Sequence, residues 1–179
     1  MPFGLGRRWG SSWNRLTDLA LGGWELSGIA TARTGFPVNI SVNRASGDVP
    51  TGNTQQQRPN LVPGVNPYPE KRTPQNWLNL AAFAVPARGT FGNLGRNALR
   101  GPGLFQLDTA VARRISVTER IGLSLRAEAF NLTNRPQYGN PNANISAPGQ
   151  FGTITSVVNS GATGSGRSRS LQFMARLDF

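Results

Sequence analysis

The chain offers few side chains that could carry out catalysis. Its 179 residues include no histidine and no cysteine, which excludes histidine-dependent triads, catalytic thiolates and metal sites built from imidazole or thiolate. The eight carboxylates fall into no paired-acid or metal-loop motif; they are Asp18, Glu25, Asp48, Glu70, Asp108, Glu119, Glu128 and Asp178. We therefore predict no catalytic residue, no metal ligand and no cofactor, and expect a protein that is not an enzyme.

One segment has the spacing of a phosphate-binding loop. Residues 161–168 read Gly-Ala-Thr-Gly-Ser-Gly-Arg-Ser, close to the pattern Gly-x4-Gly-Lys-Ser/Thr whose backbone N–H groups cradle phosphate. Arg167 stands where that pattern needs lysine, and the segment leads into a predicted strand rather than a helix. We therefore favour a flexible loop over a nucleotide site.

The positive charge of the chain is spread along its length. The formal net charge is +11, and Lys71 is the only lysine, so arginine supplies nearly all of it. A basic chain suggests nucleic acid as a partner, but no basic run exceeds two residues and none is interleaved with aromatic residues. We predict no nucleic-acid binding, and expect arginines on wet faces and loops, where they meet lipid head groups or carboxylates.

The last eleven residues carry the clearest structural pattern. Residues 169–179 alternate strictly between apolar and mostly polar side chains, which is typical of a strand with one apolar face. The length suits a tilted strand across a bilayer, and the terminal phenylalanine resembles the signal read by the bacterial outer-membrane assembly machinery. The side chains predicted to face lipid and to form this signal are Leu171, Phe173, Ala175, Leu177 and Phe179.

Three further segments alternate in the same way: 24–42 with a bend at Pro37, 104–114 and 120–132. The connections 43–103 and 133–168 are rich in glycine, proline and asparagine, and 115–119 is a short connector. No apolar run is long enough for a transmembrane helix, whereas barrel strands need only alternate apolar positions. We predict an all-β chain of about four or five antiparallel barrel strands, with the long loops outside the cell and the short connector in the periplasm.

The opposite face of these strands carries charge. The predicted lumen-facing charged residues are Asp108, Arg126, Glu128 and Arg176. Two interpretations stay open: a patch that contacts a substrate, or a charge ladder that hydrates the lumen and pairs across strands. The second is favoured, because a polar lumen requires such residues in any barrel.

Several short motifs occur together in a characteristic order. The chain resembles the C-terminal part of the Oar-like, TonB-dependent outer-membrane proteins over almost its whole length. The motifs are 22–29 (Gly-Gly-Trp-Glu-Leu-Ser-Gly-Ile), 34–37, 58–61, 77–79 with 82–83, 89–97 (Gly-Thr-Phe-Gly-Asn-Leu-Gly-Arg-Asn), 100–103, 118–120 and 126–134 (Arg-Ala-Glu-Ala-Phe-Asn-Leu-Thr-Asn).

This resemblance implies that residues 1–179 are a partial barrel domain from the bacterial outer membrane. In that family a carboxypeptidase-regulatory-like domain and a plug precede a barrel of about 22 strands. The implied partners are outer-membrane lipid, the assembly machinery, the rest of the barrel and its plug, and the TonB system through preceding N-terminal parts. The first residues do not have the pattern of a signal peptide, so we expect a longer protein, whose function is to bind or pass a large ligand.

One alternative of a different class remains. A soluble, secreted all-β adhesion or binding module could use basic loops to bind carbohydrate or polyanion. Such a module stays monomeric without detergent, whereas barrel strands with open edges and an apolar face aggregate. The alternation that ends at Phe179 favours the barrel.

Overall fold

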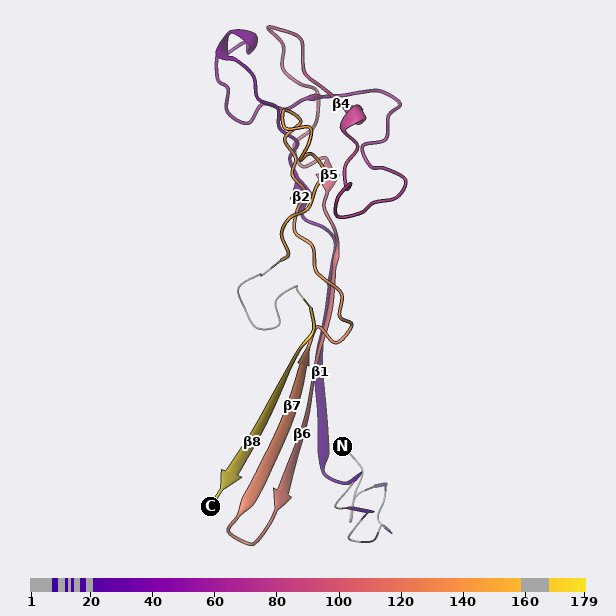
Figure 1. Ribbon diagram of the computed structural model, residues 1–179, viewed down its shortest axis with the longest axis vertical. Coiled ribbons are helices and arrows are strands. Elements are labelled where there is room, and N and C mark those ends of the chain that lie inside the picture. The colour runs from indigo at the N-terminus through magenta and orange to yellow at the C-terminus, as the bar shows by residue number, and fades with distance from the viewer. Residues whose placement is uncertain (1–7, 10–11, 13, 15–16, 19–20, 159–167) are drawn as a thin grey trace. The chain divides into compact units, whose positions relative to one another are not determined.

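The computed structural model describes residues 8–9, 12, 14, 17–18, 21–158 and 168–179 (Figure 1). Within them the main chain forms strands and two short 3-10 helices: β1 (Trp24–Arg33), β2 (Pro37–Val38), η1 (Ser46–Asp48), β3 (Asn60–Leu61), η2 (Leu80–Ala82), β4 (Phe83–Ala84), β5 (Leu99–Arg100), β6 (Leu104–Ser116), β7 (Gly122–Phe130) and β8 (Ser170–Asp178). No helix among these residues is both long enough and apolar enough to cross a membrane. The chain divides into two compact units, and each is described by itself.

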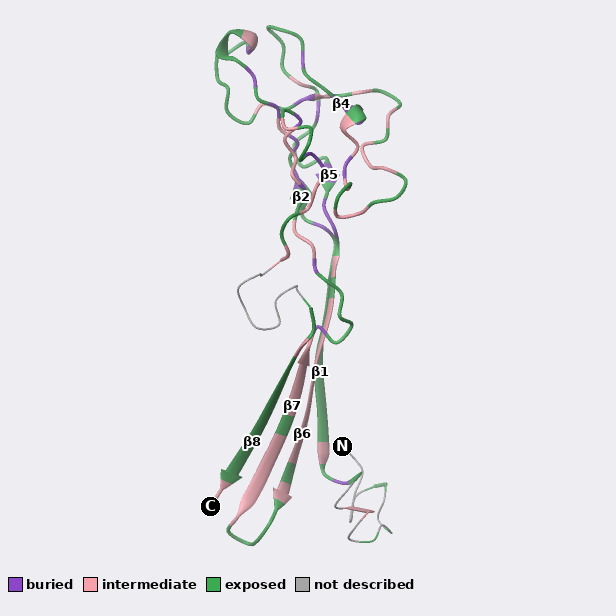
Figure 2. Ribbon diagram, viewed as in Figure 1, coloured by how far each residue is buried: buried purple, intermediate pink, exposed green. Residues whose placement is uncertain are grey.

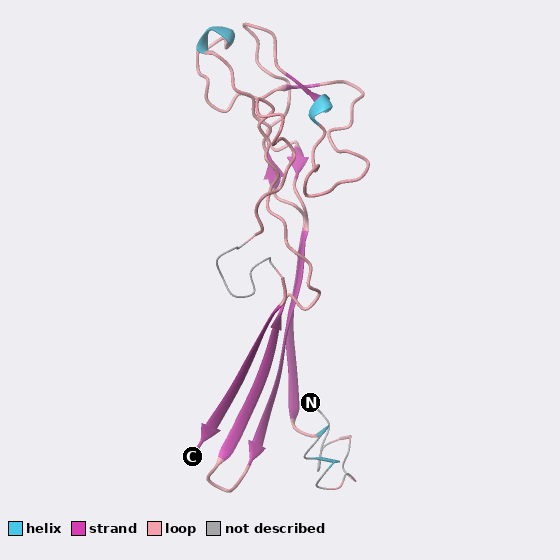
Figure 3. Cartoon of the chain, viewed as in Figure 1, coloured by secondary structure: helices cyan, strands magenta, loops and turns pink. Residues whose placement is uncertain are grey.

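Unit 1 comprises Met1–Thr31, Phe105–Pro136 and Asn159–Phe179, and its main feature is a four-stranded sheet. The strand order is β1-β6-β7-β8, and the β6–β7 and β7–β8 pairs are antiparallel (Figure 3). The sheet confirms the all-β fold class. It also confirms strands within the predicted segments 24–42, 104–114, 120–132 and 169–179.

The register aligns the apolar residues of neighbouring strands. Val111 on β6 is opposite Ala127 on β7, and Ala127 is opposite Phe173 on β8. Because successive side chains of a strand point to opposite faces, every second residue from these positions lies on the same face. A slip by one residue would move all apolar side chains of a strand to the other face, so the pattern specifies the register.

The turn between β6 and β7 lies slightly later than the predicted connector 115–119. β6 continues to Ser116, and β7 begins at Gly122. The backbone N–H groups of Val117 and Thr118 donate to the carbonyl of Ile121, over 2.9 and 3.1 Å. The Thr118 hydroxyl accepts the N–H of Ile121 at 3.0 Å, which closes the turn. The prediction was wrong by two residues because this local side-chain bond, not hydropathy, sets the end of the ladder.

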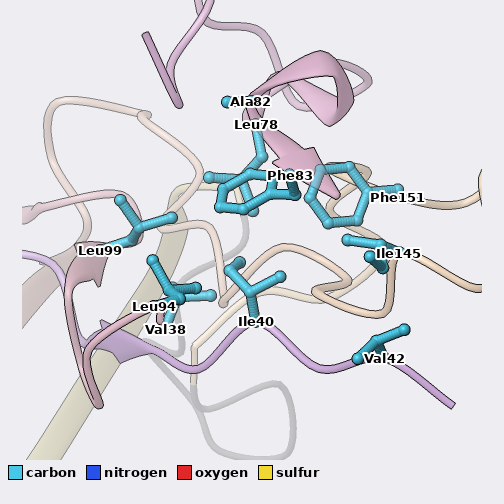
Figure 4. Close-up of a cluster of buried hydrophobic side chains, with 10 residues drawn as sticks. All are labelled: Val38, Ile40, Val42, Leu78, Ala82, Phe83, Leu94, Leu99, Ile145 and Phe151. Atoms are coloured by element: carbon cyan, nitrogen blue, oxygen red, sulfur yellow. The ribbon is translucent and has the colours of Figure 1, made fainter. Parts of the chain in front are cut away.

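Unit 2 comprises Ala32–Leu104 and Gln137–Val158, and it has a hydrophobic core (Figure 4). The buried apolar side chains come from both segments; they are Val38, Ile40, Val42, Leu78, Ala82, Phe83, Leu94, Leu99, Ile145 and Phe151. The Phe83 and Phe151 rings meet edge to face, with 5.6 Å between their centroids. Ser41 joins the segments, since its N–H donates to Ala143 and its carbonyl accepts from Ile145.

The predicted single strand over 24–42 is wrong beyond Arg33. β1 ends at Arg33, and β2 belongs to a separate two-stranded sheet in which Val38 is opposite Leu99 of β5. A Cβ on Gly35 would collide with the carbonyl oxygen of Gly101, so only glycine permits this close approach. The alternation over 38–42 is real, but its apolar side chains are buried in the core of unit 2.

The connection 43–103 has little regular structure, yet it is packed. Its short strands β3 and β4 pair antiparallel, with Leu61 opposite Phe83. Leu78 and Leu94, from the same connection, are almost fully buried, and Figure 2 marks further buried positions in purple. Residues without a regular hydrophobic spacing thus still form a core, because apolar side chains that are far apart in sequence pack together in the fold.

Candidate functional site

The first feature of the site is the apolar face of the four-stranded sheet. The register places Leu171, Phe173, Ala175 and Leu177 of β8 on the same face as Leu123, Leu125 and Ala127 of β7. The side chains on β8 are exposed, since Phe173 retains 75% of its accessible surface and Leu177 retains 57%, whereas those on β7 are half-buried. Phe179 follows β8 and is 96% exposed. Within the described residues no core covers these β8 side chains, and an apolar face this open needs an apolar environment.

Arg113 and Trp24, whose side chains end in N–H groups, lie together at this apolar face. The register puts Arg113 opposite Leu125, and its guanidinium carbon lies 5.4 Å from the centre of the Trp24 ring. Arg113 Nη2 also donates to the backbone carbonyl of Asp18 at 3.1 Å. Arginine stacked on tryptophan, with an apolar stem and a polar head, suits the boundary between lipid and water. Sequence analysis missed this role of Arg113; the one signal was its odd-numbered place in the alternation of β6.

The opposite face of the sheet is charged. Arg126 Nη2 and Glu128 Oε1 are 2.6 Å apart, and Arg176 Nε and Asp178 Oδ1 are 2.8 Å apart. The two residues of each ion pair are two positions apart on the same strand. The expected pairing across strands is therefore wrong for these four charged side chains. The register shows why: Glu128 lies opposite Gln172, and Arg126 opposite Met174. Neither charge has an opposite charge across the β7–β8 ladder.

Asp108 shares this face by its place in the alternation, but it has a different environment. Its Oδ1 accepts the backbone N–H of Asn131 at 2.8 Å, and Gln106 Nε2 donates to both of its carboxylate oxygens at 2.9 Å. Asp108 therefore holds the turn after β7 against β6. The structure brings Arg126 and Glu128 together and aligns Arg176 with Ser124 beside them. That these four residues face a lumen stays a prediction.

Asn131 is a structural residue that sequence analysis did not single out. It is completely buried and has a left-handed backbone, with φ at 52°. Its Nδ2 donates to the carbonyl of Arg135 at 2.8 Å, and its Oδ1 accepts the hydroxyl of Thr133 at 3.2 Å. Asn134 then accepts the N–H of Arg169 at 2.9 Å, which ties the start of β8 to the same turn. The only sequence signal was the cluster of turn-forming residues.

The sequence motifs that suggested chemistry bring no chemical groups together in the described part of the chain. Residues 161–167 of the phosphate-loop-like segment lie outside the described residues. Among the residues that are described, no three His, Cys, Asp or Glu side chains gather in a way that could hold a metal ion. The features on which a function can be built are thus the two faces of the sheet and the packed loops of unit 2.

Comparison with known proteins gives one family. No curated protein and no solved structure matches the chain. Residues 1–172 match a family described as outer membrane beta barrel domain, which covers nearly the whole sequence. The sheet with one apolar and one charged face agrees with this match. The chain belongs to the outer membrane beta barrel domain family, whose place is the bacterial outer membrane.

Proposed function

We propose that this chain is the C-terminal section of the barrel of a TonB-dependent, Oar-like receptor or transporter. The observation that carries the proposal is the sheet of unit 1, whose strands have an open apolar face and a charged face. Within the described residues β1 and β8 are the edges of that sheet. A transmembrane barrel needs at least about eight strands, so both edges pair with further strands of the same barrel.

The proposed orientation follows from the connections. Unit 2 contains the chain that joins β1 to β6, and the route from β7 to β8 also passes through it. The turn from β6 to β7 is short. Since outer-membrane barrels have short periplasmic turns and long outer loops, unit 2 lies outside the cell and the turn over 117–121 lies in the periplasm. The face with Phe173 meets lipid, and the face with Arg126 and Glu128 meets the lumen.

The proposed role is binding and passage of a large ligand, not catalysis. Ion pairs within one strand keep the lumen face charged and hydrated, and the packed loops of unit 2 supply a shaped surface for the ligand. Energy for passage comes from the TonB system through the plug of the barrel. Family membership favours this role over a soluble secreted module, because that family resides in the outer membrane.

The test is energy-dependent uptake in cells that express the protein. Labelled oligosaccharides and peptides too large for general porins are offered to a TonB-containing strain and to a strain that lacks TonB. We expect periplasmic accumulation of at least one tracer in the first strain and only surface binding in the second. Equal accumulation in both strains would contradict TonB dependence, and a lack of accumulation in either would contradict passage.

A further inference from the structure

We propose that a groove in unit 2 binds an anionic oligosaccharide. The groove has a volume of about 600 Å³, and all of its lining residues except Ile40 have polar side chains; it is lined by Asn39, Ile40, Ser41, Gln56, Arg58 and Arg96. A smaller hollow of about 200 Å³ adjoins it, shares Gln56 and Arg58, and adds the ring of Phe91. This inference rests on the proposed function, because a ligand reaches the groove from outside the cell.

The charge of the groove selects an anion. Arg58 and Arg96 line one cavity, and within the described residues neither takes part in an ion pair. The two carboxylates of unit 2 are Asp48 and Glu70, and Asp48 is already paired with Arg88 at 2.6 Å. Two guanidinium groups that share a groove repel each other until an anion enters. Their planar forks match carboxylate or phosphate oxygens with two parallel hydrogen bonds.

The wall that carries Arg58 is held in place by tight packing. Pro59 is fully buried, and a Cβ on Gly92 would collide with the carbonyl oxygen of Arg58. Gln57 Nε2 donates to the carbonyl of Asn53 at 2.6 Å, and Val42 N–H donates to the carbonyl of Gln57 at 2.9 Å. These contacts fix Gln56 with a φ of 49°, a left-handed conformation that is unusual for a residue with a side chain. Gln56 lines the groove, and its amide can exchange hydrogen bonds with a ligand there.

The wall that carries Arg96 is fixed as well. The next residue, Asn97, has a φ of 56°, and its N–H donates to Asn39 Oδ1 at 2.8 Å. That bond orients the Asn39 side chain so that its amide nitrogen remains a donor for a ligand. The floor is Ile40, which is 1% exposed and belongs to the hydrophobic core. The polar groups of the groove therefore stand on packed backbone and are preorganised for binding.

The ligand class follows from this combination of groups. Two guanidinium groups recognise acidic oxygens, and the amides and the Ser41 hydroxyl suit the many hydroxyls of a sugar. Phe91 is 57% exposed beside Arg58, and its flat apolar ring can pack against the C–H face of a pyranose. A small inorganic anion would use only the arginines. A chain of uronic-acid sugars would use the arginines, the amides and the ring together.

The experiment measures binding of trigalacturonate to the protein purified in detergent from outer membranes, by calorimetry. Maltotriose is the neutral probe and inorganic phosphate is the bare anion. We expect trigalacturonate to bind more tightly than either, with an affinity that falls as salt rises. The variants Arg58→Gln and Arg96→Gln should each weaken trigalacturonate binding by about tenfold or more, since each loses a charge-assisted pair. Arg58→Lys should recover part of the loss, because it keeps the charge but not the fork.

Arg88→Gln is the matched control. Arg88 lies in the same unit, its side chain is 85% exposed, and it lines neither hollow. We expect it to leave trigalacturonate binding unchanged. Three results would overturn the proposal: no binding of trigalacturonate, equal weakening by Arg88→Gln, or binding of maltotriose or phosphate as tight as that of trigalacturonate. Heat-modifiable migration of each variant on gels confirms that it is folded.

The binding and uptake experiments together distinguish an error about the groove from an error about transport. Groove-dependent binding of trigalacturonate without TonB-dependent uptake of any tracer would keep the site and overturn transport. TonB-dependent uptake of other tracers, with no trigalacturonate binding, would keep transport and overturn the site.

Discussion

At the residue scale, buried polar side chains determine the structure where hydrophobic alternation ends. The Asn131 side chain makes its hydrogen bonds within the turn after β7, and its backbone N–H donates to the Asp108 carboxylate. Arg44 is 9% exposed in unit 2, and its guanidinium donates to the carbonyls of Thr90 and Asp48 at 2.6 Å and of Ala87 at 2.9 Å. A buried polar group that loses its partner retains the full cost of desolvation.

The Asn131→Ala variant should be strongly destabilised. It removes the side-chain bonds to Arg135 and Thr133 and leaves alanine with a positive φ, so the free energy of unfolding should fall by about 2 to 4 kcal/mol. The measurement is the urea midpoint of the protein in detergent. Asn76→Ala is the control, because Asn76 is exposed and pairs with Thr73 through backbone hydrogen bonds, which alanine keeps. A midpoint equal to that of the unmodified protein would show that the turn does not depend on Asn131.

The Arg44→Met variant should loosen unit 2. Three carbonyls lose their donor, at a cost of about 3 kcal/mol. We expect protease cleavage within 86–91 to begin at a lower urea concentration than in the unmodified protein. Arg88→Met removes only an exposed ion pair with Asp48, worth about 1 kcal/mol or less, so its cleavage profile should barely move. Equal shifts in the two variants would refute the structural role of Arg44.

At the element scale, the strands of unit 1 could be predicted from the sequence and the core of unit 2 could not. Alternation is a local property, so segments such as 104–114 are recognised without knowledge of their neighbours. Val38, Ile40 and Val42 also alternate, but their partners Leu78, Leu99 and Ile145 are remote in sequence. The sequence pattern therefore predicts one long strand over 24–42 instead of two separate strands. The groove around Arg58 and Arg96 has no sequence signature either, since four separate segments form it.

The two faces of β8 should respond differently to a new charge. Phe173→Arg places a charge on the apolar face at mid-strand, where lipid contact makes arginine cost about 2 to 4 kcal/mol. Gln172→Arg places the same charge on the adjacent residue, which faces the charged side. We expect reduced outer-membrane assembly, read from heat-modifiable migration, for the first variant and normal assembly for the second. Equal assembly of both variants would contradict the assignment of the apolar face to lipid.

The register of β7 and β8 can be tested by disulfide formation, because the chain has no native cysteine. Leu123 and Leu177 are paired across these strands, so Leu123→Cys with Leu177→Cys should cross-link on oxidation. Leu123→Cys with Arg176→Cys is the matched control, whose side chains point to opposite faces. Cross-linking of the control pair in preference to the paired positions would show that the register is shifted by one residue.

At the scale of the whole molecule, we propose that the chain is divided across the outer membrane. The family match gives the membrane, and the sheet gives strands with one apolar face. The proposed orientation adds that unit 2 is outside and that the turn over 117–121 is in the periplasm. The spacing of the alternating segments in the sequence predicts the same long and short connections, but the packing within unit 2 depends on non-local contacts that only the structure shows.

Labelling of single cysteines in intact cells tests this division most directly. Thr51→Cys introduces a thiol at an exposed turn of unit 2, and Glu119→Cys introduces one at the exposed turn between β6 and β7. The reagent is a maleimide polymer too large to pass porins. The proposed orientation predicts that Thr51→Cys is labelled in intact cells and that Glu119→Cys is labelled only after the outer membrane is permeabilised. Labelling of Glu119→Cys from outside, with Thr51→Cys protected, would contradict it.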